Sequence, residues 1–434
     1  MNHQNVKTEP NSTTYDFSIL LVLVGLTFYL TADTLTGFLE HKGLKLALSP
    51  SQIWKFFILG GMLVYIAKTK YEYVILALTY FGILVAPRYI DFLGHEDLKG
   101  FLSDIVYALK YSSFFIAFIW ARTLFTISDI YLKKINQIFI INFIVLALNL
   151  FGGVLGYGYS QYGNIGSVGY FIAGNEISGL IIIVFGLILN YFFKKKQKYY
   201  LLACLMLIVL SLLKSTKVAI AGTILLTFLI PYFSENLPIL SLSNLRKKIL
   251  MSFLVMIPFL IIGLYFAMIY TGLWERIQYF YTHYDFLTFL LSGRNKYVEV
   301  VIEVFESNFS VFQLLFGKGY FNGMNEIRLF YGGVDTISEI DIVDLFYQFG
   351  FVGLILVFSL WFYFIKTSYQ KMITNNSMMA SAVFIINILL FLISFPAGHI
   401  LYSGIAGILI GIMNGIQFVV IEKSTNKTLS FSEH

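Results

Sequence analysis

The sequence predicts an all-α, polytopic membrane protein, and two observations support this fold class. Of the 434 residues, 58% are hydrophobic and 12% are charged, which is about half the charged share of soluble proteins. Charged residues are also absent from long stretches such as 135–175. A water-soluble domain cannot bury this much apolar surface. The composition therefore excludes a soluble enzyme, a disordered chain and a nucleic-acid-binding domain.

Apolar runs bounded by charged or turn-forming residues predict about twelve membrane-spanning helices. We interpret the first run as a membrane helix and signal anchor, because no small-residue cleavage site follows it. The last two come from one long run that we divide at residues 396–399, a Pro-Ala-Gly-His sequence. The predicted spans are residues 17–35, 53–67, 72–90, 104–121, 135–153, 175–193, 199–214, 217–233, 249–270, 343–365, 378–396 and 400–421.

Lysine and arginine in the short connections predict the orientation, since these residues are enriched on the cytoplasmic side of membrane proteins. If the twelve spans alternate, the basic connections all fall on one side, which we expect to be cytoplasmic together with both termini. These connections contain Lys68, Lys70, Arg122, Lys133, Lys134, Lys194, Lys195, Lys196, Lys198, Arg246, Lys247, Lys248, Lys366 and Lys371.

The connections divide the chain into four parts. We predict a membrane bundle of nine spans over 1–270, a large extracytoplasmic loop over 271–342, three further spans over 343–421 and a cytoplasmic tail over 422–434. Acidic residues at 299, 303 and 306 alternate with apolar ones, which predicts an amphipathic helix in the loop. A loop this long in a compact membrane protein is usually functional.

Four cations near the predicted outer face are candidates for binding an anionic group. Lys214 and Lys217 break the positive-inside tendency, so they either extend to outer lipid headgroups or face a cavity. Arg294 follows a glycine turn and precedes a helical pattern, which favours phosphate, although it can equally be a solvated loop residue. Arg328 is a weaker candidate on the same side.

Four carboxylates also lie at the predicted outer face. Glu339, Asp341 and Asp344 occur where the chain re-enters the membrane, and Glu176 stands at the start of another span. Acidic residues favour helix N-termini, so each of them can be a simple helix cap. Alternatively, Glu176 faces a cavity and binds substrate, and one of the three clustered carboxylates, with a raised pKa, acts as a general base.

Several familiar site motifs are missing from the sequence. It has no Walker-type loop, no dinucleotide glycine fingerprint, no metal-ligand spacing of His, Cys and Asp, and no GxSxG elbow. The cations and carboxylates at the predicted outer face remain as the candidate site residues. They suit a reaction on a lipid-linked phosphate that is driven by the substrate's own bond and needs no metal, nucleotide or other cofactor.

Three segments, in order, resemble the O-antigen polymerase and ligase family of membrane glycosyltransferases. They are the aromatic-rich segment Gly169–Glu176, the segment Lys214–Lys217, and a large loop. The loop opens with Ser292–Arg294, continues with Leu315–Gly319 and closes with Glu339–Phe346, followed by Gly350 and Gly353.

The resemblance implies a C-type glycosyltransferase fold in the bacterial cytoplasmic membrane. It implies inverting transfer of an undecaprenyl-pyrophosphate-linked glycan on the outer face, with a flippase and a chain-length regulator as possible partners. Arg294 and Lys217 would hold the pyrophosphate, and Glu339 stands where ligase-type members have a histidine. The Glu-x-Asp-x-x-Asp pattern is similar to that of capsule-type polymerases. We therefore favour a repeat-unit polymerase, with a glycan ligase and a transporter of lipid-linked sugars as alternatives.

Overall fold

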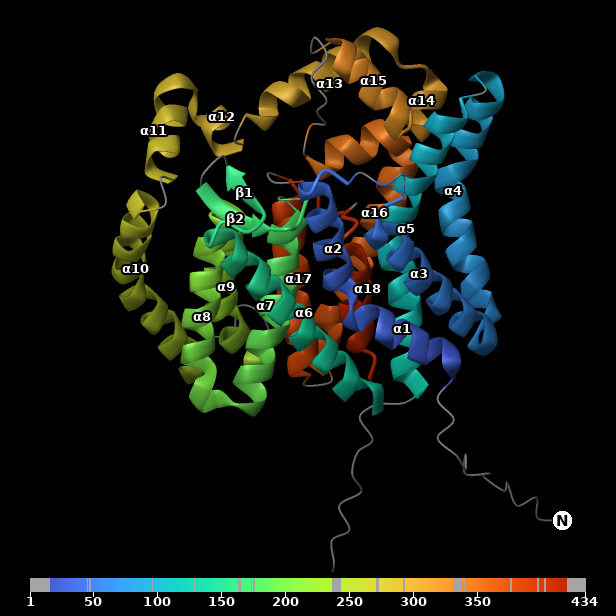
Figure 1. Ribbon diagram of the computed structural model, residues 1–434. Helices are drawn as coiled ribbons and strands as arrows, with labels where there is room; N and C mark the ends of the chain where they lie inside the picture. The colour runs from blue at the N-terminus through green and yellow to red at the C-terminus, as the bar shows by residue number, and fades with distance from the viewer. Residues whose placement is uncertain are drawn as a thin grey trace, which may run out of the picture.

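The computed structural model shows a helical bundle with one small sheet (Figure 1). It describes residues 16–44, 46, 48–95, 97–127, 130–162, 165–172, 174, 176–235, 243–270, 273–291, 293–330, 338, 340–374, 377–395, 398–401 and 403–419.

The first part of the chain forms most of the bundle and the only hairpin among the described residues. Its elements are α1 (Phe17–Thr27), α2 (Tyr29–His41), α3 (Pro50–Thr69), α4 (Tyr71–His95), α5 (Leu98–Ile127), α6 (Ile130–Val154), β1 (Tyr159–Tyr162), β2 (Ile165–Gly169), α7 (Glu176–Lys195), the 3-10 turn η1 (Gln197–Tyr199), α8 (Tyr200–Lys214), α9 (Lys217–Tyr232) and the 3-10 turn η2 (Phe233–Glu235).

The second part contains one long helix, several short helices and the end of the bundle. Its elements are α10 (Asn244–Tyr270), α11 (Leu273–His283), α12 (Phe286–Leu291), α13 (Arg294–Asn308), α14 (Val311–Phe316), α15 (Tyr320–Phe330), α16 (Asp341–Thr374), α17 (Met378–Ser394) and α18 (Gly407–Ile416). Helices α13, α14 and α15 lie together at one end of the bundle, at the top of Figure 1.

Seven helices within the described residues are long and apolar enough to cross a membrane: α3, α4, α5, α6, α7, α8 with η1, and α16. The pair α1 and α2 adds an eighth span if its 50° bend is counted within one crossing. Helices α9, α17 and α18 are apolar but shorter. The all-α polytopic membrane class is therefore confirmed, and the number twelve stays a prediction.

The first predicted span is divided into two helices, and a buried asparagine forms hydrogen bonds with the backbone groups at the division. Asn142 of α6 accepts a hydrogen bond from the Leu30 backbone N–H at 3.1 Å and donates to the Leu26 carbonyl at 2.9 Å. Backbone groups inside a bilayer need such partners because no water reaches them. The bend between α1 and α2 at Phe28 is thus supported by a neighbouring helix.

The antiparallel hairpin β1–β2 was not expected from the sequence. Its register pairs Ser160 with Ser167. Gly169, at the end of β2, has φ of +62° and lies against the backbone of Asn149, where an added Cβ would come within 2.4 Å of the carbonyl oxygen. This close approach places the hairpin against α6, in a segment whose glycines hide any alternating strand pattern.

The bundle centre depends on close packing of α5 against α18. Gly407, Gly411 and Gly415 recur every fourth residue on α18 and face α5. A Cβ on Gly411 would lie 2.3 Å from the Phe114 carbonyl oxygen, so only glycine permits this distance between the helices. Small residues at this spacing are typical of membrane helix contacts, where close approach of the backbones stabilises the pair through van der Waals packing.

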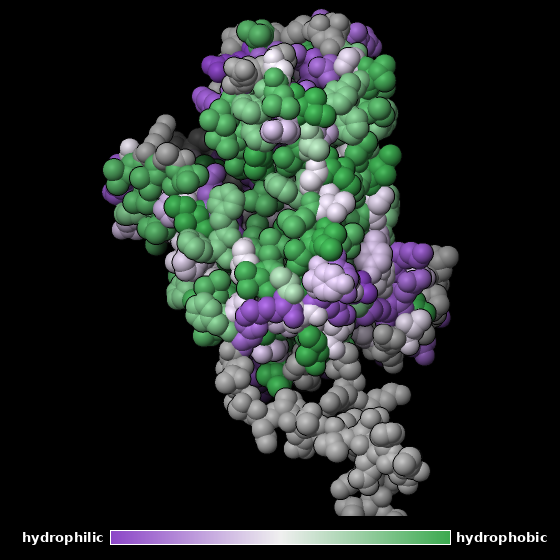
Figure 2. Space-filling view, turned by 90° about the vertical axis from the view of Figure 1, so that its right-hand side faces the viewer, coloured by the Kyte–Doolittle hydropathy of each residue, from purple (hydrophilic) through white to green (hydrophobic). Residues whose placement is uncertain are grey.

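Hydrophobic residues cover the middle of the face shown in Figure 2, and hydrophilic residues gather in a zone near its lower end. Exposed large apolar side chains on the described helices include Phe57, Val64, Ile75, Leu76 and Ile90 of α3 and α4. Such an apolar belt on a soluble monomer would be unusually large. It is the surface expected of a protein that faces lipid.

Candidate functional site

Lys217 lies against the short helix that precedes Arg294. It is the first residue of α9, and its Nζ donates a hydrogen bond to the Phe289 carbonyl of α12 at 3.1 Å. The same Nζ lies 4.4 Å from the centre of the Phe289 ring. Arg294 begins α13, directly after Gly293, whose φ of +86° permits the turn. The structure thus brings Lys217 to the helix that precedes Arg294, more than 70 residues later in the chain.

The turn between α12 and α13 is organised by its own polar side chains. Asp285 accepts hydrogen bonds from the backbone N–H and the hydroxyl of Thr288, both at 2.8 Å. These bonds lower the pKa of Asp285 below its ordinary value, because they stabilise the carboxylate. Asn295 donates to the Thr288 hydroxyl at 2.8 Å, which links the first turn of α13 to α12.

Lys214 lies away from Lys217 despite its proximity in sequence. It is fully buried at the end of α8, and its Nζ donates to the side-chain carbonyl of Gln161 on β1. The next residue, Ser215, has φ of +56°, which turns the chain before α9 begins. Lys214 therefore binds the hairpin to the bundle, and Lys217 is the cation that reaches the loop helices.

Two of the three clustered carboxylates hold backbone. Asp341 is fully buried, and its Oδ2 accepts hydrogen bonds from the N–H groups of Ile400 and Leu401 at 2.9 and 3.0 Å. Asp344 accepts from the N–H and the hydroxyl of Ser338 at 3.0 and 2.7 Å. Glu339 lies outside the described residues, but Ser338 and Asp341 on either side of it are both fixed.

Glu176 holds the same segment that Asp341 holds. Its Oε2 accepts hydrogen bonds from the Ser403 hydroxyl at 2.5 Å and from the Ile405 N–H at 3.1 Å. Carboxylates of α7 and α16 therefore bind Ile400, Leu401, Ser403 and Ile405. Among the described residues of the last predicted span, 400–421, the helix is α18, and the N–H groups of Ile400, Leu401 and Ile405 before it bind these side chains.

The Leu315–Gly319 segment fastens the loop helices to the bundle. Arg88 of α4 is almost fully buried and donates to the Phe316 and Gly317 carbonyls at 2.9 and 2.7 Å. Lys318 forms an ion pair of 2.6 Å with Glu326 of α15. Arg328, at the end of α15, is exposed and lies beyond this attachment.

Comparison with known proteins gives one family. Residues 274–424 match a family model described as "O-antigen ligase like membrane protein". Over residues 274–424 the chain is therefore similar to the O-antigen ligase-like family. Neither the curated proteins nor the solved structures gave a match.

The O-antigen ligase-like region begins in α11 and ends after α18. It contains Arg294, Arg328 and the Glu339–Asp344 cluster, whereas Glu176, Lys214 and Lys217 lie before it. The predicted family resemblance is confirmed over this region. Within the described residues, no group of three or more His, Cys, Asp or Glu is placed to hold a metal ion.

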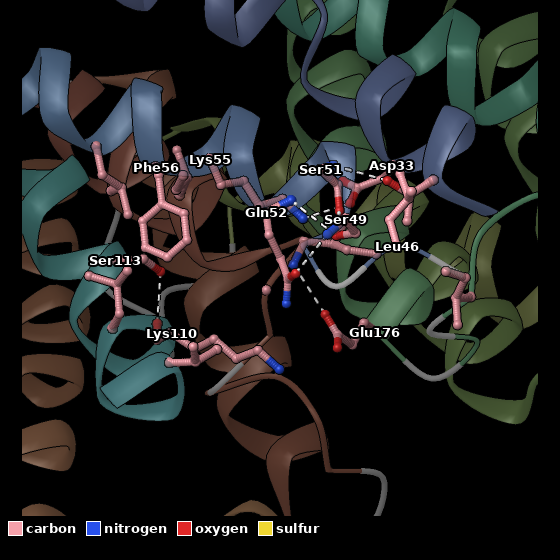
Figure 3. Close-up of a pocket in the computed structure, with 18 of the residues that line it drawn as sticks. Asp33, Leu46, Ser49, Ser51, Gln52, Lys55, Phe56, Lys110, Ser113 and Glu176 are labelled. Atoms are coloured by element: carbon pink, nitrogen blue, oxygen red, sulfur yellow. Dashed lines mark hydrogen bonds and ion pairs between the residues drawn. The ribbon is translucent and has the colours of Figure 1, made fainter. Parts of the chain in front are cut away.

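A polar pocket of about 480 Å³ contains charged residues that the sequence analysis did not select. Figure 3 shows Asp33 of α2, Lys55 of α3 and Lys110 of α5 around this pocket, together with Glu176. Asp33 and Lys55 form an ion pair of 2.6 Å. A signal for these residues exists in the sequence, because all three are ionisable residues within predicted spans.

Proposed function

We propose that this O-antigen ligase-like protein is a polysaccharide polymerase. It joins oligosaccharide repeat units carried on undecaprenyl pyrophosphate, on the outer face of the bacterial cytoplasmic membrane. The observation that carries the proposal is the contact between Lys217 and the Phe289 carbonyl, which brings one predicted pyrophosphate-binding cation to the helix preceding the other, Arg294.

The proposed reaction is a single inverting displacement. An acceptor sugar hydroxyl attacks the anomeric carbon of the donor glycan, and the bond from that carbon to the pyrophosphate oxygen breaks. Lys217 and Arg294 stabilise the negative charge that develops on the leaving pyrophosphate. A carboxylate takes the hydroxyl proton, and the loop holds both glycans in line. No nucleotide, metal or other cofactor enters this scheme.

We assign the proton acceptor to Glu339. Asp341 is fully buried and its Oδ2 already accepts two backbone hydrogen bonds, so an acceptor sugar has no access to it. Asp344 is occupied by Ser338, which also accepts a hydrogen bond from the Ile340 N–H at 3.2 Å. Asp341 and Asp344 are therefore positioning residues that fix the chain on either side of Glu339.

A glycan ligase is the second candidate function, and the description of the matching family favours it. The two activities are distinguished by deleting the gene and analysing polysaccharide size together with lipid-linked intermediates. A polymerase leaves single repeat units on the lipid at the outer face, with no long chains. Long lipid-linked chains that never reach a final carrier would indicate a ligase. Repeat units trapped on the inner face would indicate a flippase and would contradict the proposed chemistry.

Two substitutions test the site within the same assay. Arg294→Ala and Glu339→Gln are expected to abolish polymer, because each removes a charge that acts on the reacting groups. Both variants should still insert into the membrane, which immunoblotting of membrane fractions checks. Polymer of wild-type length and amount from both variants would disprove the site assignment.

A further inference from the structure

Two hollows meet on helix α3, and Phe56 lines both of them. One is the polar pocket, to which α3 contributes Gln52, Lys55 and Leu59. The other is an apolar groove of about 500 Å³ between α1 and α3, lined by Phe17, Ser18, Leu21, Ile53, Phe56, Phe57, Gly60, Gly61 and Val64. Residues three and four apart share a helix face, so the two hollows occupy adjacent faces of α3.

The pocket holds charged groups that the protein itself does not fully satisfy. Asp33 is 7% exposed, and its Oδ2 is buried without a hydrogen-bond partner in the described part of the chain. The Lys110 ammonium lies 4.2 Å from the Tyr107 ring centre, and Lys110 lines the same pocket. Lys55 pairs with the other oxygen of Asp33, so the unmet group is Oδ2 alone. A buried acceptor without a hydrogen bond is costly, which favours a ligand that donates one in this pocket.

The groove has the composition and length of a binding site for a hydrocarbon chain. Apolar residues line nearly all of it, from Ile53 to Val64 along α3. The eleven helical steps from Ile53 to Val64 rise about 16 Å, roughly half of the bilayer's hydrocarbon thickness. Gly60 is exposed at its floor, with no atom within 4 Å of the position that a Cβ would take.

We propose that the pocket and the groove together bind the acceptor, a second lipid-linked saccharide. Its isoprenoid chain lies in the groove, its phosphate pairs with Lys110, and its sugar hydroxyls bind Asp33 and Gln52. This inference rests on the proposed polymerase function, in which the donor pyrophosphate binds at Lys217 and Arg294. A polymerase joins two lipid-linked substrates, so it requires a second site of this chemistry.

The pocket is also connected to Asp341, the positioning residue near the proposed base. Gly404 and Ile405 line it, and the Ile405 N–H binds Glu176, another lining residue. Asp341 accepts hydrogen bonds from the Ile400 and Leu401 N–H groups, which precede Gly404 in the same segment. Asp341 itself follows Glu339 by two residues. An acceptor in the pocket thus contacts the segment that Asp341 attaches to the start of α16.

The experiment is native mass spectrometry of the purified full-length protein. The probe is undecaprenyl-pyrophosphate-linked N-acetylglucosamine, with phosphatidylglycerol as competitor. The wild type is expected to bind two probe molecules per chain. Gly60→Leu, which places a side chain in the groove from a position with open space at its Cβ, and Lys110→Gln, which removes a positive charge from the pocket, should each weaken one site roughly tenfold or more. The double variant Lys217→Ala, Arg294→Ala should remove the other site.

Gly82→Leu is the matched control, because Gly82 of α4 also has open space at its Cβ position and lines neither hollow. It should keep both sites. Wild-type protein with a single site that depends on Lys217 and Arg294 would overturn the inference and leave the proposed function standing. Equal displacement of the α3-site probe by phosphatidylglycerol would also overturn it. A wild type that binds no probe would overturn both.

Discussion

Asp341 and Glu176, on two different helices, support one short stretch of backbone. Together they accept hydrogen bonds from the N–H groups of Ile400, Leu401 and Ile405. Buried N–H groups in a membrane protein cannot fall back on water, so each lost acceptor leaves a cost of about 1–3 kcal/mol. These carboxylates therefore matter for stability whether or not they take part in chemistry.

Substitution of Asp341 should separate these contributions. Asp341→Ala leaves the Ile400 and Leu401 N–H groups without an acceptor, so we expect a loss of about 2–4 kcal/mol in the free energy of unfolding. Asp341→Asn keeps an oxygen that can accept both bonds and should lose much less. Thermal unfolding of the detergent-purified variants measures the difference. Equal stability of the wild type and Asp341→Ala would contradict the structural role.

Lys217 provides a test of charge at the leaving group. Lys217→Met should lower the polymerisation rate roughly hundredfold, since the developing pyrophosphate charge loses one cation. Lys217→Arg keeps the charge and can still donate to the Phe289 carbonyl, so its rate should stay within roughly tenfold of the wild type. The measurement is polymer formation from purified lipid-linked repeat units. A similar rate for Lys217→Met and the wild type would remove Lys217 from the site.

The unusual charged residues could be identified from the sequence, but their hydrogen-bond partners could not. Asp341, Asp344 and Glu176 stood out because a carboxylate at the edge of an apolar run is unusual. Their hydrogen bonds to residues 338 and 400–405 depend on tertiary packing, which residue spacing does not reveal. Asp33, Lys55 and Lys110 are charged residues within predicted spans, so the sequence indicates them as unusual, but their convergence on one pocket depends on tertiary packing.

At the scale of elements, the attachment of the loop helices to the bundle depends on two glycines, one after α14 and one within α16, at which the two backbones contact each other. A Cβ on Gly317 would lie 2.3 Å from the Gln348 carbonyl carbon, and one on Gly350 would lie 2.4 Å from the Leu315 carbonyl carbon. Both residues also have positive φ, which other residues rarely adopt. The segment after α14 and the middle of α16 thus touch backbone to backbone.

Gly317→Ala should weaken this attachment by about 1–3 kcal/mol, because it combines a steric clash with an unfavourable φ. We expect faster proteolytic cleavage within α13–α15 in limited proteolysis of the purified protein. Gly82→Ala, with no atom near its Cβ position, is the control and should behave like the wild type. Unchanged cleavage of the Gly317 variant would show that the crossing tolerates a methyl group.

Long apolar helices were the most predictable elements. The runs at 53–67 and 135–153 correspond to α3 and α6, since lipid exposure forces a continuous apolar sequence. The break at Phe28 was not predictable, because its support comes from Asn142, more than 100 residues away. The hairpin β1–β2 was also missed, because glycine-rich segments carry little periodicity.

For the whole molecule, orientation is the main prediction that remains to be tested. Cys204 is a buried free cysteine, so a Cys204→Ser background removes it. In intact cells, a membrane-impermeant maleimide should label Asn325→Cys on exposed α15 and should miss Lys196→Cys between α7 and α8. After permeabilisation both should react. The reverse pattern in intact cells would place the loop helices in the cytoplasm.

The bend of α16 at Gly350, with φ of 62° and ψ of −163°, has a consequence for biosynthesis. It frees the Tyr347 and Gln348 carbonyls, which accept hydrogen bonds from the Lys318 and Gly319 N–H groups at 2.9 and 3.0 Å. These donors leave the ribosome about 30 residues earlier than the carbonyls they serve. The chain order therefore makes the donor segment available before the bent helix partitions into lipid, where uncapped carbonyls would oppose its insertion.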